Sequence, residues 1–215
     1  MTSFQVNAIL FDNDGVLVDS HDAAAAAWNR WARTWAPAFD FHRDIQHGRR
    51  LADVVGDLVA AEHADVATRD LLDLEMRCAT DVPAIPGASD LLRSIPTSSW
   101  VVVTSGAREM ALARMSFAGL PQPRAIISAD DVRAGKPAPD PYVAGAAALN
   151  VDPSACAVFE DAPLGVVSAR AAGVPIVVGV GPATIGCEID VGISTLLGIT
   201  FDGTTLVIPD AVKIS

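Results

Sequence analysis

Short apolar runs alternate with amphipathic stretches along this sequence from residue 85 onward, and one more apolar run lies near the N-terminus. The runs have the pattern of buried strands, and the amphipathic stretches have that of helices. The predicted strands are residues 7–11, 100–103, 125–128, 157–159, 176–180 and, more weakly, 205–208; the predicted helices are residues 88–95, 109–117, 141–149 and 163–172. Such alternation implies parallel pairing through right-handed crossovers. We therefore predict an α/β fold with a doubly wound parallel sheet.

The segment between the first two predicted strands has a different pattern, because its apolar residues recur at helical spacing throughout. We interpret it as a helical insertion, residues 19–84, in a core made of residues 1–18 and 85–215. Three tryptophans are expected to form the core of this insertion: Trp28, Trp31 and Trp35.

Composition and charge exclude several classes of protein. The chain has 215 residues, 51% of them apolar, so it can bury a sizeable core, and its formal net charge of −11 argues against nucleic-acid binding. No apolar run approaches the roughly 20 residues of a membrane helix, and the N-terminus lacks the pattern of a signal peptide. We expect a cytoplasmic protein, monomeric by default, with no nucleic-acid or membrane partner. The three cysteines are widely spaced and are expected to be buried thiols.

Polar residues fall in four groups where strands end. The groups are Asp12 with Asp14, Thr104 with Ser105, Lys136 alone, and Glu160 with Asp161. Each group alone has an ordinary structural explanation, since such residues form turns, cap helices and suit the first turn of a helix. Together they bring four carboxylates, a hydroxyl and a lysine to one edge of the sheet, where ligands bind in such folds. Carboxylates so close repel unless a divalent cation and a lysine neutralise them, so the arrangement predicts an active site.

The residue types indicate phosphoryl transfer. A carboxylate can attack a phosphoryl group when Mg²⁺ and another cation screen the two anions, and we assign this nucleophilic role to Asp12. Asp14 lies two residues along the turn and can protonate the leaving-group oxygen, then deprotonate the water that hydrolyses the acyl-phosphate. Thr104 and the amide of Ser105, in the turn that continues to Gly106, are expected to bind the phosphate oxygens.

The same edge of the sheet predicts a magnesium site. Mg²⁺ prefers octahedral oxygen ligands and keeps some of its waters. We expect Asp12, the backbone carbonyl of Asp14 and Asp161 to be ligands, with Glu160 as a further ligand or close beside them. Lys136 is expected to neutralise Asp12 and the transferring group. Lysine is rare in this chain, which has thirteen arginines and two lysines.

Four motifs resemble those of one enzyme superfamily and occur in its order. Residues 11–20 (FDNDGVLVDS) look like the first motif of haloacid-dehalogenase-superfamily phosphatases, and residues 102–106 (VVTSG) resemble the second. Residues 135–142 (GKPAPDPY) and 158–165 (VFEDAPLG) resemble the third and fourth. The insertion between the first two motifs resembles the helical cap of the β-phosphoglucomutase-like subgroup. The second motif and the residues after it look closest to glycerol-3-phosphate and 2-deoxyglucose-6-phosphate phosphatases.

The resemblance implies a Mg²⁺-dependent phosphatase that hydrolyses a small sugar or polyol phosphate through an aspartyl-phosphate, with the cap selecting the substrate. His47, Arg49 and Arg50 lie in a segment that resembles the substrate loop of the subgroup, and they are the candidate substrate-binding residues of the cap. Glu75 and Arg77 are expected to be an exposed pair on a helix.

The nearest alternative is a sugar phosphomutase of the same superfamily. Such a mutase carries a His four residues after a Thr at the start of its cap, and the matching positions here are Ser20 and Ala24. A dehalogenase needs neither Asp14 nor the acidic metal site. A phospho-accepting receiver module, which is not an enzyme of this kind, is far shorter and has no such insertion. We therefore favour hydrolysis.

Overall fold

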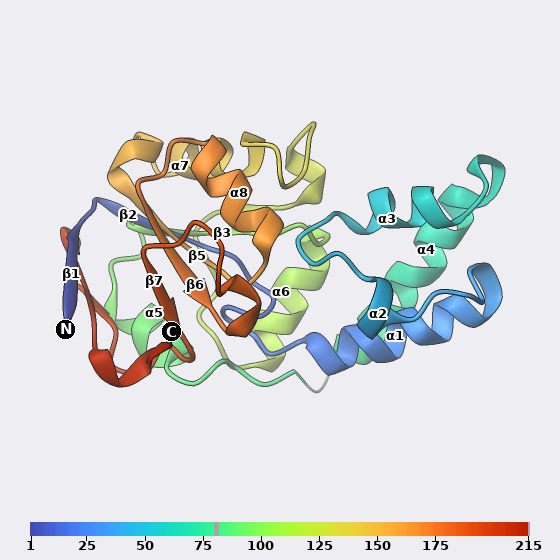
Figure 1. Ribbon diagram of the computed structural model, residues 1–215, viewed down its shortest axis with the longest axis horizontal. Helices are drawn as coiled ribbons and strands as arrows, with labels where there is room; N and C mark the ends of the chain where they lie inside the picture. The colour runs from blue at the N-terminus through green and yellow to red at the C-terminus, as the bar shows by residue number, and fades with distance from the viewer. Residues whose placement is uncertain (80–81, 215) are drawn as a thin grey trace.

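A seven-stranded sheet forms the centre of the fold (Figure 1). The computed structural model describes residues 1–79 and 82–214; residues 80, 81 and 215, which belong to the predicted ranges 19–84 and 85–215, lie outside it. In spatial order the strands are β10 (Lys213–Ile214), β7 (Val191–Ile193), β6 (Ile176–Val180), β5 (Cys156–Glu160), β2 (Ala8–Phe11), β3 (Trp100–Val103) and β4 (Ile126–Ile127). All neighbours are parallel except β10 and β7. The predicted α/β fold with a parallel sheet is confirmed.

The register of the central strands aligns their carboxyl ends. Phe11, the last residue of β2, is opposite Phe159 in β5 and Val102 in β3. Parallel neighbours end at the same edge of a sheet, and the residues that follow them therefore meet there. The residues that emerge at this edge include Asp12 after β2 and Thr104 after β3.

Helices cover both faces of the sheet. Those of the core are α5 (Ala88–Ser94), α6 (Arg108–Phe117), α7 (Asp140–Ala148) and α8 (Pro163–Ala171), and each agrees with a predicted helix to within one or two residues. The apolar side chains of β2 alternate between the two faces, because Ile9 packs in the cluster that contains α5 and α6, and Leu10 packs in the cluster that contains α7 and α8. Short 3₁₀ helices connect other elements: η2 (Ala129–Asp131), η3 (Pro153–Ala155), η4 (Pro182–Thr184) and η5 (Asp210–Val212).

A smaller antiparallel sheet joins the two ends of the chain. It consists of β1 (Thr2–Gln5), β9 (Thr205–Ile208) and β8 (Thr200–Phe201), in the order β1-β9-β8. The weakly predicted strand at residues 205–208 is therefore present, but it pairs with β1 instead of extending the central sheet. The sequence pattern did not predict β1, β8, β7 or the edge strand β10. Lys213, in β10, donates hydrogen bonds to Asp210 and Thr2.

Four helices, α1 (His21–Trp35), α2 (Phe41–Asp44), α3 (Leu51–Leu58) and α4 (Ala61–Cys78), pack together beside the core and are called the helical segment below (Figure 1). They share an apolar cluster that includes Trp28, Trp31 and Leu71. The interpretation of the tryptophans as core residues is confirmed for Trp28 and Trp31, whereas Trp35 is half-buried.

Two other expectations concern cysteines and membranes. Cys156 is buried, as predicted, but Cys78 and Cys187 are only half-buried, so the expectation of buried thiols is wrong for these two. None of the helices in residues 1–79 and 82–214 combines the length and the apolar character that a bilayer span requires.

Candidate active site

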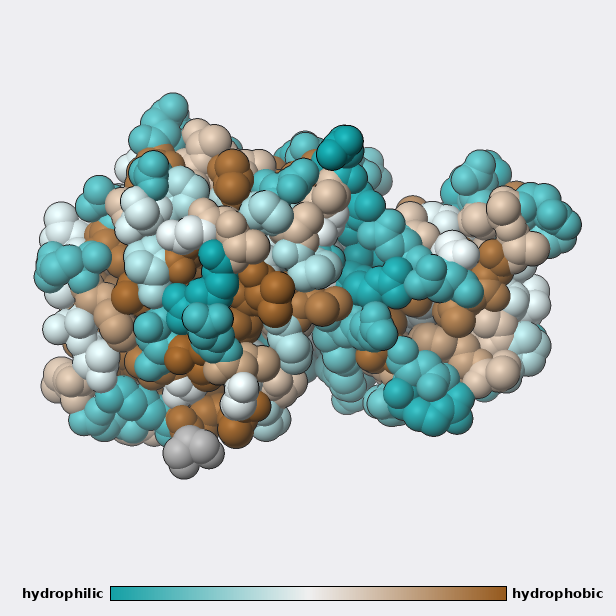
Figure 2. Space-filling view, turned by 45° about the horizontal axis from the view of Figure 1, so that its top comes forward, coloured by the Kyte–Doolittle hydropathy of each residue, from teal (hydrophilic) through white to brown (hydrophobic). Residues whose placement is uncertain are grey.

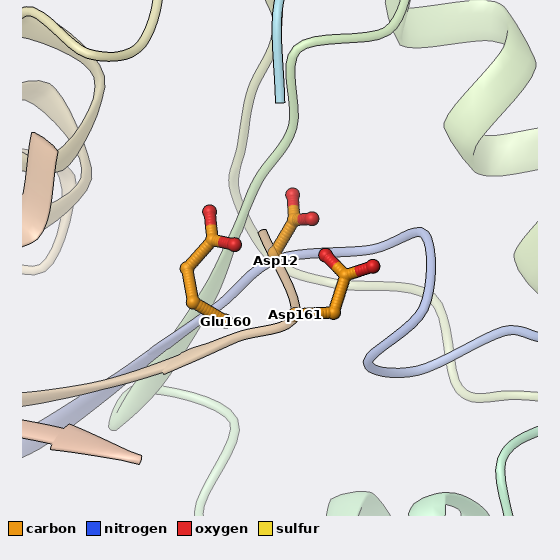
Figure 3. Close-up of side chains that lie close together, drawn as sticks. All are labelled: Asp12, Glu160 and Asp161. Atoms are coloured by element: carbon orange, nitrogen blue, oxygen red, sulfur yellow. The ribbon is translucent and has the colours of Figure 1, made fainter. Parts of the chain in front are cut away.

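Three carboxylates gather at the carboxyl edge of the central sheet (Figure 3). Asp12 follows β2 and its backbone N–H donates to the carbonyl of Phe159 at 2.9 Å, which fixes it beside the end of β5. Glu160 is the last residue of β5, and Asp161 comes next. One carboxylate oxygen from each of Asp12, Glu160 and Asp161 lies within 4.8 Å of the other two. The prediction that the first and fourth motifs meet is thus in agreement with the geometry.

Lys136 lies within this acidic group, and its ammonium has three acceptors. Its Nζ donates to Asp12 Oδ1 at 2.9 Å, to Glu160 Oε1 at 2.5 Å and to the carbonyl of Val103 at 3.3 Å. Its side chain is 1% exposed. Burial alone would lower the pKa of Lys136, but the charges of Asp12 and Glu160 and the hydrogen bonds to them outweigh it and raise the pKa. The ammonium group therefore remains charged next to Asp12.

Protein donors occupy both oxygens of Glu160. Besides Lys136, the hydroxyl of Tyr142 donates to Oε1 at 2.8 Å, and the backbone N–H of Ala162 donates to Oε2 at 3.0 Å. Gly165 makes room for this carboxylate, since a Cβ there would lie 1.7 Å from Oε1. A cavity borders this edge of the sheet; among the described residues, Asp12 and Asp161 line it, whereas Glu160 is fully buried and does not. This geometry favours Asp161 over Glu160 as a direct metal ligand.

The donor set fits a hard divalent cation. Burial raises the pKa of Asp12 to about 7, an effect that Lys136 offsets only in part and to which Glu160 and Asp14 add. Burial and then the charges of Asp12 and Glu160 raise the pKa of Asp161 well above its usual range. A cation bound by oxygen ligands would remove this repulsion. Asp12, Glu160 and Asp161 are the carboxylates that could hold it, and of these Asp12 and Asp161 border the cavity.

A glycine allows the first motif to approach Asp161 closely. Gly15 has φ +78°, and a Cβ at this position would lie 2.1 Å from Asp161 Oδ2. Both the positive φ and the contact require glycine. The turn that carries Asp12 and Asp14 is thereby held against the carboxylate of the fourth motif.

The side chain of Asp14 makes a different set of contacts. Its Oδ1 accepts hydrogen bonds from Ser20 Oγ at 2.5 Å and from Arg114 Nη1 at 2.7 Å, and its Oδ2 accepts one from Asn13 at 3.3 Å. Its side chain is 30% exposed and borders the cavity. Asp14 is therefore accessible to a ligand that reaches Asp12.

The turn after β3 borders the same cavity. Thr104, Ser105 and Gly106 all line it, and the N–H of Gly106 donates to Thr104 Oγ1 at 3.0 Å. Ser105 Oγ donates to the carbonyl of Gly48 at 2.6 Å, so this turn also contacts the loop between α2 and α3. The cavity measures about 150 Å³ and lies between the core and the helical segment, where Figure 2 shows hydrophilic residues gathered.

The candidate binding residues of the helical segment occupy different places. His47 and Arg49 line the cavity, and Arg49 forms an ion pair with Asp57 at 2.7 Å. Burial lowers the pKa of His47, with further contributions from its histidine neighbours. Arg50 forms hydrogen bonds with Asp53 and with two backbone carbonyls of the loop before Lys136, and it does not border the cavity formed by residues 1–79 and 82–214.

Two residues at the cavity were not assigned a role from the sequence. Arg114, on α6, and Glu75, on α4, are both buried and both border the cavity. The expectation that Glu75 is exposed is wrong, because the Nε1 of Trp28 donates to it and Arg114 faces it across the junction. Burial raises the pKa of Glu75, and Arg114 opposes this rise. Arg77 is exposed, but it pairs with Asp73 at 4.0 Å and not with Glu75, so the expected Glu75–Arg77 pair is wrong.

Comparison with known proteins agrees with the geometry. The model of the family described as "haloacid dehalogenase-like hydrolase" matches residues 6–173. Hexitol phosphatase A of Escherichia coli (strain K12) is 39% identical over 180 residues, which are 81% of this chain and 83% of that protein. Glycerol-1-phosphate phosphohydrolase 2 of Saccharomyces cerevisiae is 35% identical over 189 residues, which are 81% of this chain and 75% of that protein.

Solved structures show the same architecture. A putative beta-phosphoglucomutase from Bacteroides vulgatus superposes with a TM-score of 0.75 at 25% identity, over 89% of this chain and 85% of that one. The four motifs meet at the edge where the parallel strands end, and the comparisons match the same residues. The chain belongs to the haloacid dehalogenase-like hydrolases.

Proposed function

We propose that this protein is a Mg²⁺-dependent phosphatase that hydrolyses a small sugar or polyol phosphate through an aspartyl-phosphate. The observation that carries the proposal is the position of Asp12. Its carboxylate borders the cavity, with the Lys136 ammonium at 2.9 Å and Asp161 beside it. The names of the hexitol and glycerol phosphate phosphatases that resemble this chain support the same class of substrate.

We propose that the helical segment acts as a cap domain. Its boundaries are residues 19–84, and the catalytic core comprises residues 1–18 and 85–215. Two observations support this division. The helices α1–α4 share an apolar cluster of their own, and Val18 is bridged to Ala84 where the chain enters and leaves the segment. A substrate in the cavity would contact both parts.

The first step of the proposed mechanism is attack by Asp12 Oδ on phosphorus, with cleavage of the bond from phosphorus to the leaving-group oxygen. Thr104 and the backbone N–H of Ser105 would bind the phosphoryl oxygens, and Lys136 would offset the charge that gathers between Asp12 and the phosphoryl group. Bound Mg²⁺ would neutralise the anions that approach one another.

Asp14 would exchange protons in both steps. It would give a proton to the departing alkoxide, and the resulting carboxylate would take a proton from the water that attacks the aspartyl-phosphate. Release of inorganic phosphate would regenerate Asp12. The hydrogen bonds from Ser20 and Arg114 to Asp14 would have to loosen for this group to turn to the leaving oxygen.

A mutase remains the second candidate, because a putative beta-phosphoglucomutase superposes on most of the chain. Ala24 lines the cavity here, at the position that resembles the histidine of the mutases. A methyl group cannot exchange a proton with the substrate, so the site supports hydrolysis better.

A phosphate-release assay tests the proposal. Purified protein with Mg²⁺ is expected to turn over p-nitrophenyl phosphate repeatedly, and a panel of sugar and polyol phosphates should contain a better substrate. Conversion of one sugar phosphate isomer into another, without phosphate release, would favour the mutase. The absence of both reactions would overturn the proposal.

A further inference from the structure

Three charged side chains form a line from the first motif to the helical segment. Arg114 lies between the other two, with Nη1 at 2.7 Å from Asp14 Oδ1 and Nη2 at 3.7 Å from Glu75 Oε2. The side chains of Arg114 and Glu75 are 6% and 11% exposed. Glu75 belongs to α4 and Arg114 to α6, so the line crosses the junction of the helical segment and the core.

The Glu75 carboxylate has one oxygen occupied and one facing Arg114. The indole N–H of Trp28 donates to Oε1 at 2.9 Å, and this fixes the orientation of the carboxylate. Oε2 is too far from Nη2 for a strong hydrogen bond. In the part of the chain that the structure describes, neither Nε nor Nη2 of Arg114 has a hydrogen-bond acceptor.

Nη2 of Arg114 and Oε2 of Glu75 face each other at 3.7 Å, and both residues line the cavity; the space beside this donor and this acceptor, called the gap below, suits a hydroxyl group. An alcohol can donate its proton to the Glu75 carboxylate and accept from the Arg114 guanidinium at the same time. Buried polar groups without partners cost free energy, so a ligand that supplies both partners gains it. A carboxylate could only accept, and an ammonium could only donate.

The charges near the gap also select against an anionic group. The guanidinium of Arg114 already faces two carboxylates, those of Asp14 and Glu75. A third carboxylate, supplied by the substrate, would be repelled by Glu75 in a site with little solvent. A neutral hydroxyl meets no such repulsion.

The position of the gap matches the part of a substrate that lies next to its ester oxygen. Asp14, Arg114 and Glu75 border the same cavity as Asp12 and Asp161. A leaving-group oxygen close to Asp14 would place the following carbon atoms near the guanidinium. A hydroxyl one or two carbons away would therefore reach Glu75.

We propose that Glu75 and Arg114 form a hydroxyl-binding subsite, which selects phosphate esters with a free hydroxyl close to the ester over esters with a carboxylate there. This inference rests on the proposed phosphatase function and adds the residues that set its specificity.

The test compares kcat/KM for three esters with Mg²⁺: glycerol 3-phosphate, 2-phosphoglycolate and p-nitrophenyl phosphate. The wild type is expected to prefer glycerol 3-phosphate to 2-phosphoglycolate. Glu75→Gln should lower the ratio of kcat/KM for glycerol 3-phosphate to kcat/KM for p-nitrophenyl phosphate at least about tenfold, because the hydroxyl loses its hydrogen bond to a charged acceptor. The same variant should also reduce the preference for glycerol 3-phosphate over 2-phosphoglycolate.

Two further variants control for folding and for charge. Asp73→Asn removes a carboxylate from the same helix at an exposed position. In this variant, kcat/KM for glycerol 3-phosphate relative to each of the other two esters should stay at its wild-type value. Glu75→Asp keeps the charge but shortens the side chain, and it should lower the glycerol 3-phosphate ratio in the same direction as Glu75→Gln.

The outcomes separate the subsite from the enzyme activity. Equal losses on all three esters would overturn the subsite and show that Glu75 only docks α4 on the core. Unchanged ratios in both Glu75 variants, or a wild type that prefers 2-phosphoglycolate, would also overturn it. A wild type that releases phosphate from none of the esters would refute the proposed function, and the subsite with it.

Discussion

Replacement of Lys136 by arginine keeps the positive charge but changes its shape. The Lys136 ammonium fits between Asp12, Glu160 and the Val103 carbonyl, with an acceptor for each of its three protons. The Tyr142 ring lies 5.2 Å from Nζ and closes the site further. A planar guanidinium is larger and distributes its donors along a fork, so it cannot reproduce these contacts.

The magnitude follows from the contacts. Loss of the charged hydrogen bond to Asp12 corresponds to about 1.5–3 kcal/mol, which is roughly a ten- to hundredfold loss of turnover if it is needed in the transition state. The extra volume in a site that is 1% exposed is expected to lower the free energy of unfolding by about 1–3 kcal/mol. We therefore expect Lys136→Arg to fold, to unfold at lower denaturant concentration and to lose at least about tenfold in kcat.

Lys213→Arg is the matched control. Lys213 is the other lysine of the chain and is partly exposed. It contacts Asp210 and Thr2, which do not belong to the candidate site. Initial rates of phosphate release and urea unfolding curves would be measured for both variants. Near-wild-type kcat for Lys136→Arg would refute the reasoning, because charge alone would then suffice at this position.

Further predictions concern the nucleophile and the metal site. Asp12→Asn is expected to abolish phosphate release without loss of the fold, because an amide is a far poorer nucleophile; circular dichroism and the phosphate assay check this, and residual turnover above about a tenth of wild type would contradict the assignment. EDTA should abolish turnover. In a Mg²⁺ titration, Asp161→Ala should raise the Mg²⁺ concentration that gives half-maximal activity more than Glu160→Gln does; the reverse order would make Glu160 the more direct ligand. Gly15→Ala, whose Cβ would lie 2.1 Å from Asp161 Oδ2, should reduce the thermal stabilisation by Mg²⁺, which for an intact site is about 1.4 kcal/mol at ten times Kd; an unchanged shift would argue against this site.

The positions of the motif residues could be predicted because they depend on strand ends. A short apolar run followed by polar residues places Asp12 and Thr104 at the carboxyl edge of a parallel sheet, and the observed register of Phe11 with Phe159 and Val102 agrees with this. The pattern is local, so the sequence carries it directly.

Glu75 could not be placed in the same way, because its environment depends on a contact between α4 and a helix of the core. Along α4 it occupies a polar position beside Arg77, and such a pattern is typical of a solvated face. Its burial results from Arg114 on α6 and Trp28 on α1, which are far from it in the chain. The pairing of β1 with β9 was missed for a similar reason, since the partners come from opposite ends of the sequence.

The burial of Lys136 has a practical consequence for chemical labelling. Acylating reagents that target lysine require an accessible, deprotonated amine, and the Lys136 ammonium is enclosed and held in its charged form by Asp12 and Glu160. The other lysine, Lys213, belongs to β10, which is separated from β2 by β7, β6 and β5. Coupling through lysine side chains would therefore attach this protein to a dye or a surface by the edge of the sheet remote from Asp12, with the cavity left open to substrate.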